Sequence, residues 1–67
     1  RRSNSMTLKN ALRISGYTPN DLKEKLKKKG YRLNSSEIRN LCMAYRPGGS
    51  SVWNAVLSCL DDMGVDW

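Results

Sequence analysis

The sequence predicts an all-α domain, a compact bundle of four or five short helices. Leucines recur at the three- and four-residue spacings of a helix face, four segments begin and end at typical helix boundary residues, and no stretch alternates like a strand. The chain has 67 residues, of which 39% are hydrophobic, which suits one small folded domain. A domain of this size has no room for an enclosed active site beside its core.

The first helix is expected over residues 7–15, after which Gly16 offers a left-handed stop. Its apolar stripe follows the i, i+3, i+4, i+7 pattern and consists of Leu8, Ala11, Leu12 and Ser15, with Lys9, Asn10 and Arg13 facing solvent. Residues 1–6 are expected to be either a flexible arm or a remnant added for expression. A single helical domain is therefore predicted over residues 7–67.

Strong boundary signals frame the second helix. Thr18 is a capping residue, and Pro19 occupies the first helical position, where a missing N–H costs nothing. Asp21 lies in the first turn and residues 27–29 put three lysines in the last turn, which is the favourable order for the helix dipole. The narrow apolar stripe is Leu22 and Leu26, and the helix ends at Gly30.

A capping box predicts where the third helix begins, because Asn34 is followed three residues later by Glu37. Its inward stripe is expected to be Ile38, Leu41, Cys42 and Tyr45. Residues 47–49 break the chain, and Ser50 or Ser51 then caps the fourth helix. The inward residues of that helix are expected to be Val52, Val56, Cys59, Leu60 and Met63, before a stop at Gly64.

The two cysteines and the two tryptophans are expected to serve packing. Cys42 and Cys59 fall on apolar faces, where a free cysteine behaves as a small hydrophobe. A disulfide between them stays open if the third and fourth helices pack with those faces together. Trp53 is expected to cover the edge of the core, and Trp67 either docks on the core or serves in an interface. These features fit a reduced intracellular protein, cytoplasmic or associated with the nucleoid.

Charge is divided unevenly along the chain, whose formal net charge is +6. All twelve Lys and Arg lie in residues 1–46 together with three acids, which gives +9, whereas residues 47–67 hold three acids and no base, which gives −3. This division predicts a basic face that concentrates polyanions and an acidic end. The alternative is that the charges only keep a small protein soluble.

No arrangement of residues indicates catalysis. The chain has no histidine, no nucleophile beside a base, no glycine-rich phosphate loop and no set of metal ligands, so we expect no enzyme, cofactor, metal or small-molecule substrate. Asp61 and Asp62 point about 100° apart on a helix and cannot share a site. They are expected to form an acidic patch that repels DNA or attracts a partner. No stretch resembles a signal peptide or a membrane span, so no membrane partner is expected.

The outer face of the predicted third helix carries side chains that suit DNA bases. Arginine forms paired hydrogen bonds with guanine and asparagine with adenine, and a helix N-terminus favours a phosphate. The candidate base-reading residues are Ser35, Ser36, Arg39, Asn40 and Met43. The candidate phosphate-binding residues flank this face and are Lys23, Lys27, Lys28, Lys29, Arg32 and Arg46. Taken singly, the serines could merely start a helix and the lysines could be a solvated helix end.

The stretch LNSSEIRNL, residues 33–41, resembles the second half of the helix-turn-helix of the lambda repressor and Cro group of phage and plasmid regulators. Leu33 matches the hydrophobic position of the turn, and Ile38 and Leu41 match the buried positions of the recognition helix. The stretch RPGGSSVWNAVLSCLDDMGV resembles the loop, fourth helix and ending of such domains, so the resemblance covers residues 7–66. It implies a helix-turn-helix-like fold in which DNA is contacted by Ser35, Ser36, Arg39 and Asn40.

One departure from the family pattern concerns the turn. The residues KKKGYR separate Leu26 from Leu33, and this is longer than the tight turn of the family permits. The second helix is therefore expected to be longer and to cross the third at a different angle. That leaves open which face of the third helix enters a DNA groove.

Three functions remain open from the sequence, in order of preference. The first is a sequence-specific regulator of transcription, or of a plasmid or phage region, that binds double-stranded DNA as a homodimer at a repeated or palindromic site. The second is a small helical protein-interaction module whose basic face docks an acidic partner. The third is binding of RNA or single-stranded DNA, and the scarcity of exposed aromatic residues counts against it.

Overall fold

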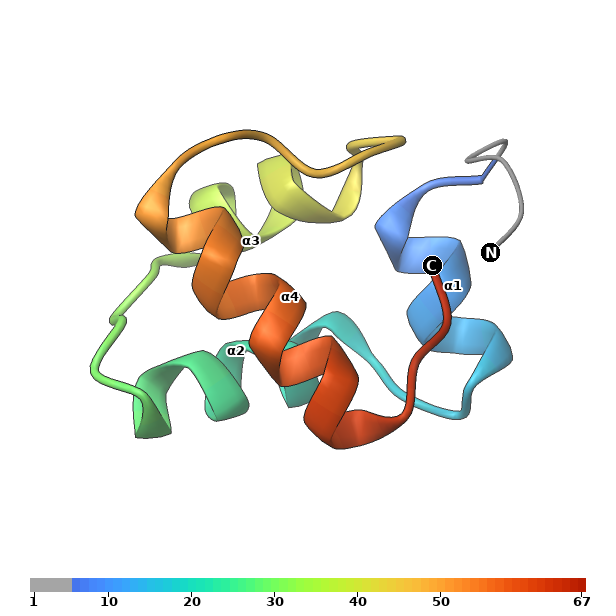
Figure 1. Ribbon diagram of the computed structural model, residues 1–67, viewed down its shortest axis with the longest axis horizontal. Helices are drawn as coiled ribbons and strands as arrows, with labels where there is room; N and C mark the ends of the chain where they lie inside the picture. Colours follow the sequence, from blue (N-terminus) through green and yellow to red (C-terminus); the bar gives the residue numbers. More distant parts are fainter. Residues whose placement is uncertain (1–5) are drawn as a thin grey trace.

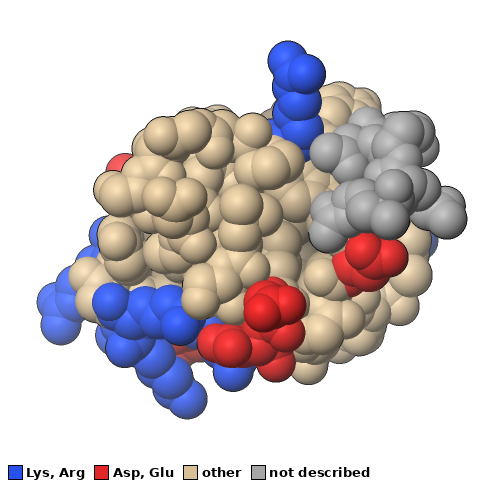
Figure 2. Space-filling view, in the orientation of Figure 1, with Lys and Arg blue, Asp and Glu red and all other residues tan. Residues whose placement is uncertain are grey.

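The computed structural model describes residues 6–67, which form four α-helices and no strand. The helices are α1 (Leu8–Ile14), α2 (Pro19–Lys28), α3 (Ser35–Cys42) and α4 (Ser51–Met63). Figure 1 shows α4 crossing the centre of the molecule, with α3 above and α2 below it. In the same orientation most of the surface over α4 is uncharged, and charged side chains gather along its lower edge (Figure 2). The all-α bundle is confirmed, and within residues 6–67 it has four helices.

The helix starts agree with the predicted capping residues. At α2 the Asp21 amide donates to Thr18 Oγ1 (3.3 Å), and the Thr18 amide donates to Asp21 Oδ2 (2.9 Å). At α3 the Glu37 amide donates to Asn34 Oδ1 (2.8 Å), and the Asn34 amide donates to Glu37 Oε1 (3.0 Å). Of the two serines that the sequence offered as the cap of α4, Ser50 is the cap and Ser51 is the first helical residue. Because the first turn of a helix leaves amides without partners, these bonds fix where each helix begins.

Three of the helices end in the same hydrogen-bonded motif. The amides of Tyr17, Tyr31 and Val65 donate to the carbonyls of Leu12, Leu26 and Leu60, at 2.8, 2.9 and 2.9 Å respectively. The residue before each donor is a glycine with positive φ, as predicted, namely Gly16, Gly30 and Gly64. The motif satisfies a carbonyl of the last turn and directs the next apolar side chain back towards the core. α3 has no such glycine and ends at its cap, Met43.

The long connection between α2 and α3 is divided between helix and loop. Lys27 and Lys28 belong to the last turn of α2, and Lys29 is its cap. Residues 30–34 continue as an irregular link that ends at the cap of α3. The link therefore begins where Gly30, with a φ of 96°, turns the chain away from the helix axis.

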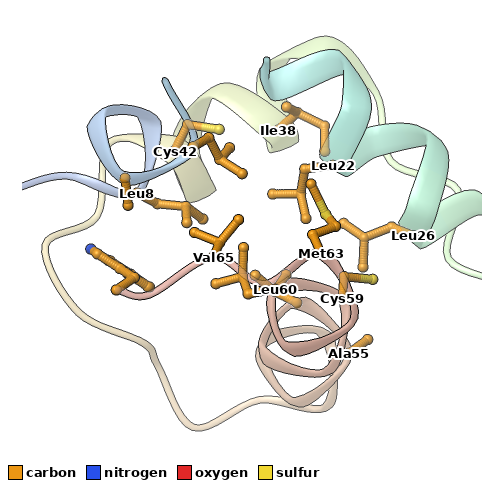
Figure 3. Close-up of a cluster of buried hydrophobic side chains, with 14 residues drawn as sticks. Leu8, Leu22, Leu26, Ile38, Cys42, Ala55, Cys59, Leu60, Met63 and Val65 are labelled. Atoms are coloured by element: carbon orange, nitrogen blue, oxygen red, sulfur yellow. The ribbon is translucent and has the colours of Figure 1, made fainter. Parts of the chain in front are cut away.

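The core lies where α2 packs against α3 and α4 and where α1 packs against α3. Its largest fully buried side chains are Leu8, Leu12, Leu22, Leu26, Val56 and Cys59. Figure 3 shows side chains of all four helices converging on one space, together with Val65 from the C-terminal segment. The predicted stripes of α1, α2 and α4 supply this core, except that Ser15 is exposed and Val52 is half-buried. Burial of these side chains is the main favourable term in folding a chain of this size.

The predicted inward stripe of α3 is wrong at its last member. The side chain of Tyr45 is 58% exposed, because α3 ends at Cys42 and residue 45 no longer follows helical geometry. Two backbone hydrogen bonds hold the chain there, from the Ala44 amide to the Leu41 carbonyl (3.1 Å) and from the Leu8 amide to the Ala44 carbonyl (3.0 Å). The second bond satisfies an amide at the start of α1, so contact with α1 takes the place of a further helical turn.

Two tryptophans and Met6 join the two ends of the described chain. Trp67 is buried and its indole Nε1 donates to the Met6 carbonyl at 3.1 Å. Trp53 stacks on Trp67, with ring centroids 5.8 Å apart and planes at 23°. A Cβ atom at Gly48 would lie 2.7 Å from the Trp53 ring, so this close approach requires glycine. Trp53 covers the core edge, as predicted, and Trp67 docks on the core. Met6, assigned to the arm from the sequence, packs on the domain, and residues 1–5 lie outside the described part.

Both cysteines, Cys42 and Cys59, are buried and free, so the disulfide that the sequence left open is not formed. Burial raises the pKa of both thiols, because a thiolate loses its hydration in the core. They act as small packing groups of α3 and α4, which is the interpretation that the apolar faces favour.

Candidate functional site

An open groove of about 660 Å³ runs between α1, the first turns of α2 and the outer side of α3. The side chains from α3 that line it are Ser35, Ile38, Arg39, Cys42 and Met43. The opposite wall consists of Lys9 from α1 and of Pro19, Asn20 and Lys23 from α2. Three of the five predicted base-reading residues therefore share one groove with one of the predicted phosphate-binding residues.

The helical repeat of α3 explains which of its side chains reach the groove. Ser35, Arg39 and Met43 are spaced four residues apart, so they follow one another along a single side of the helix. Ile38 and Cys42 are buried and form the floor beside them. The groove consequently has polar and cationic walls over an apolar floor, and the exposed Met43 (62%) stands at one end.

Three cations from three helices surround the groove. Lys9 and Arg39 are exposed and Lys23 is half-buried, and no acidic residue is among the described lining. Converging like charges repel one another and raise the positive potential of the space between them. The groove is therefore suited to an anionic ligand, and because it is open to solvent it suits a large ligand rather than an enclosed small molecule.

The N-terminus of α3 opens beside these cations. Ser35 is the first helical residue, and the amides of a first helical turn have no partner within the helix. The Glu37 carboxylate lies in the same turn, but it accepts a hydrogen bond from the Asn34 amide and does not line the groove. The Glu37 amide already donates to Asn34 Oδ1, so it is the helix dipole that adds to the attraction for an anion that the side chains provide.

The thiol of Cys42 lies in the floor of this groove, with Lys9 near it. Burial raises its pKa, and the positive charge of Lys9 opposes that shift only in part. The thiol is therefore protonated near neutral pH and is a poor nucleophile. Its contribution to the groove is an apolar surface.

A second, smaller depression of about 240 Å³ adjoins the first through a shared residue. It is lined by Lys23, Lys27, Arg32 and Leu33, so three predicted phosphate-binding residues meet there. Lys23 lines both depressions. The basic surface thus extends from Lys9 across α2 to the link before α3.

Several predicted site residues are not brought into either depression. Ser36 and Asn40 are exposed on α3, Lys28 is exposed at the end of α2, and Arg46 is exposed in the loop after α3, but none of these four lines the groove or the smaller depression. These four side chains are exposed and lie outside the groove.

Lys29 has a different environment from the one expected. Its Nζ lies 3.4 Å from Asp62 Oδ2, so it forms an ion pair with the acidic part of α4. In the sequence these two charges lie in the basic part, residues 1–46, and in the acidic part, residues 47–67. The packing of α2 against α4 brings them together. In Figure 2 the cations and the acids adjoin along the lower edge of the α4 face. Lys29 therefore lies at the edge of this face, paired with an acid, whereas Lys27 lines the smaller basic depression.

Lys9 and Asn20 belong to the groove and were not predicted to be part of a site. Lys9 was expected only to face solvent on the first helix, and Asn20 carried no prediction. Nothing in the local sequence marks either residue, because they reach α3 only through the packing of the helices. A positively charged residue on an outer helix face is too common to indicate a site.

No protein-family model, curated protein or solved structure matches the chain. Within residues 6–67 no helix is long and apolar enough to cross a membrane, and no three His, Cys, Asp or Glu side chains cluster as metal ligands would.

Proposed function

We propose that this chain is a small regulator that binds double-stranded DNA and is not an enzyme. The observation that carries the proposal is the convergence of Lys9, Lys23 and Arg39 from three helices on one groove without an acid among its described lining. An anion relieves the mutual repulsion of these cations. Duplex DNA is an abundant polyanion, with one charge per about 1.7 Å of helix axis.

The chemistry of the groove suggests how DNA binds. The major groove of DNA is about 12 Å wide and admits an α-helix, and α3 is the helix whose outer side is polar. We expect Arg39 to form paired hydrogen bonds with a guanine and Met43 to contact a thymine methyl group. Lys23, shared by both depressions, is expected to hold a phosphate and so to fix the register of α3. This is binding in the manner of a helix-turn-helix, with α3 as the recognition helix.

A homodimer at a repeated or palindromic site belongs to the same proposal. α3 has only eight residues, so one copy contacts few base pairs. Two copies on half-sites about 34 Å apart would double the contacts and multiply the specificity. The expected role is regulation of transcription or of a plasmid or phage region.

The test compares two lysines of the same region in different surroundings. Lys23 joins the two basic depressions, whereas Lys29 is paired with Asp62. Binding to duplex DNA is measured for the wild type, Lys23→Ala and Lys29→Ala over a series of salt concentrations. We expect Lys23→Ala to reduce the slope of log affinity against log salt by about 0.9, the value for one phosphate contact. Lys29→Ala should leave the slope nearly unchanged.

Two results would contradict this proposal. One is the absence of duplex binding by the wild type at low salt, and the other is an equal change of slope for both lysine variants. If an acidic peptide binds as tightly as duplex DNA at the same salt concentration, the protein-interaction module becomes the better assignment, because a general basic face does not discriminate between polyanions.

A further inference from the structure

The face over α4 contains a groove that shares no lining residue with the basic groove. It has a volume of about 480 Å³, and its lining includes Pro47, Leu57, Leu60, Asp61, Val65 and Trp67. Leu60, Val65 and Trp67 are buried and form an apolar floor. Leu57 stands at the surface with 38% of its area exposed, although it lies on the helix that supplies most of the core.

Charges of both signs lie at the edge of this face. Asp61 and Asp62 are exposed neighbours on α4, and Lys29 of α2 forms an ion pair with Asp62. Lys25 is also near, because Lys25, Lys29 and Asp62 all act on the thiol of Cys59. Figure 2 shows cations beside acids along the lower edge of this view and a mostly uncharged surface above them.

We infer that this face is the contact between two copies of the chain. The basic patch consists of Lys25 and Lys29, and the acidic patch consists of Asp61 and Asp62. We place a two-fold axis in the plane of the contact, between these two patches. Rotation about this axis sets the basic patch of each copy against the acidic patch of the other. The apolar groove and Leu57 of each copy then meet above the charges. A face with adjacent patches of opposite sign is complementary to itself, which a face of one sign cannot be.

The basic groove is excluded as the contact between copies by its own charge. Two copies facing each other through Lys9, Lys23 and Arg39 would place like charges together, which opposes association. Pairing through the α4 face leaves that groove uncovered on both copies, because the linings of the two grooves do not overlap. Only the role assigned to the dimer rests on the proposed function, because a two-fold DNA site requires two uncovered basic grooves.

The first experiment is sedimentation equilibrium of the full chain without DNA, from micromolar to millimolar concentration. The wild type is expected to shift from monomer to dimer over this range. Leu57→Asp places a charge in the contact and should leave only monomer. Ile14→Asp is the matched control, because Ile14 is a still more exposed apolar residue (73%) on α1, away from the α4 groove, and its variant should dimerise like the wild type.

A charge exchange tests the two-fold arrangement itself. One variant carries Asp61→Lys with Asp62→Lys, and the other carries Lys25→Asp with Lys29→Asp. Each variant alone sets like charges against each other across the axis and should be monomeric. An equal mixture restores opposite charges at both contacts, so the mixture should form a heterodimer. Circular dichroism of each variant confirms that it is folded, and Ser58→Arg in the same groove replaces Leu57→Asp if that variant loses helix.

Three results would overturn the inference. They are a wild type that stays monomeric at millimolar concentration, an Ile14→Asp variant that loses the dimer while Leu57→Asp keeps it, and a charge-exchange mixture that remains monomeric. A wild type that is monomeric but binds a basic peptide through Leu57 would assign the face to another protein. None of these outcomes depends on DNA, so the DNA-binding proposal and the dimer contact fail separately.

Discussion

The helices α3 and α4 begin alike and differ in almost everything that follows. Each starts at a polar cap, Asn34 or Ser50, that accepts a hydrogen bond from an amide of the first turn. α4 then buries five side chains and ends in a glycine motif, whereas α3 buries only Ile38 and Cys42 and ends without one. Because burial of apolar surface is the main favourable term in folding, α4 carries more of the stability than α3.

This difference indicates where a small domain can place a binding surface. Five of the eight residues of α3 are exposed, and only two side chains fix its position in the core. Its outer surface can therefore vary in chemistry at little cost to the fold. Fewer positions of α4 can be substituted without loss of stability, because most of its apolar residues belong to the core. The contrast predicts that substitutions on α4 change stability and that substitutions on the outer side of α3 change binding.

The largest effect is expected for Leu60→Ala on α4. Leu60 is 3% exposed, so the substitution leaves a cavity in the core and should lower the free energy of unfolding by about 2–5 kcal/mol. Leu57→Ala is the control on the same helix, and since Leu57 is partly exposed it should cost about 0.5 kcal/mol. Urea unfolding followed by circular dichroism at low protein concentration measures both. Equal losses in the free energy of unfolding would show that the buried and the partly exposed face of α4 contribute equally to stability.

The next effect is expected for Arg39→Ala on α3, and it concerns binding. We expect a loss of about 1–3 kcal/mol on a preferred duplex, the value of one bidentate contact with a base, and a smaller loss on a scrambled duplex. The free energy of unfolding should change by about 0.5 kcal/mol or less, because Arg39 is exposed. The preferred duplex is obtained by selection from a random library, and affinities are compared at one salt concentration.

Arg13→Ala is the control for this experiment. Arg13 is an exposed arginine on α1 that does not line the basic groove, so its removal should alter affinity for both duplexes only slightly. Asn40→Ala, outside the groove on α3, should cost less than Arg39→Ala. If Arg13→Ala and Arg39→Ala weaken binding equally, only the total charge of the chain matters and α3 reads no bases.

A smaller effect is expected at the start of α3. Asn34→Ala removes the acceptor of the Glu37 amide and should lower the free energy of unfolding by about 1 kcal/mol. Asn40→Ala removes the same side chain from an exposed position within the same helix and should not destabilise the domain. Thermal unfolding of both variants gives the difference. An unchanged melting temperature for Asn34→Ala would mean that packing alone determines where α3 begins.

The smallest effect is expected from the buried thiols at alkaline pH. Burial raises the pKa of Cys42 and Cys59, so the folded state holds these protons more tightly than the unfolded state does. The resulting stabilisation is complete below the ordinary pKa of a thiol and is lost as the pH rises through the raised values of the folded state. The free energy of unfolding should therefore fall with rising pH in that range. The double variant Cys42→Ala with Cys59→Ala should show a shallower fall, and an identical slope would exclude the thiols as its source.

The starts of the helices and three of their four ends could be predicted from the residues alone. The caps at Thr18 and Asn34 and the left-handed stops at Gly16, Gly30 and Gly64 all lie where the residues predicted them. Each depends on hydrogen bonds between residues three to five apart, so the local sequence contains everything that is needed. The apolar stripes were predictable for the same reason, because the helical repeat places their members on one side.

The contacts between different helices depend on how the whole chain packs. Tyr45 faces solvent because an amide of α1 bonds to the carbonyl of Ala44, and no pattern within α3 contains that contact. Lys9 enters the basic groove because α1 packs on α3, and Lys29 pairs with Asp62 because α2 packs on α4. These contacts join residues far apart in the chain, and the sequence specifies them only through the shape of the whole core. The charge pattern therefore predicted that a basic surface exists, while the packing of four helices determined which cations form it.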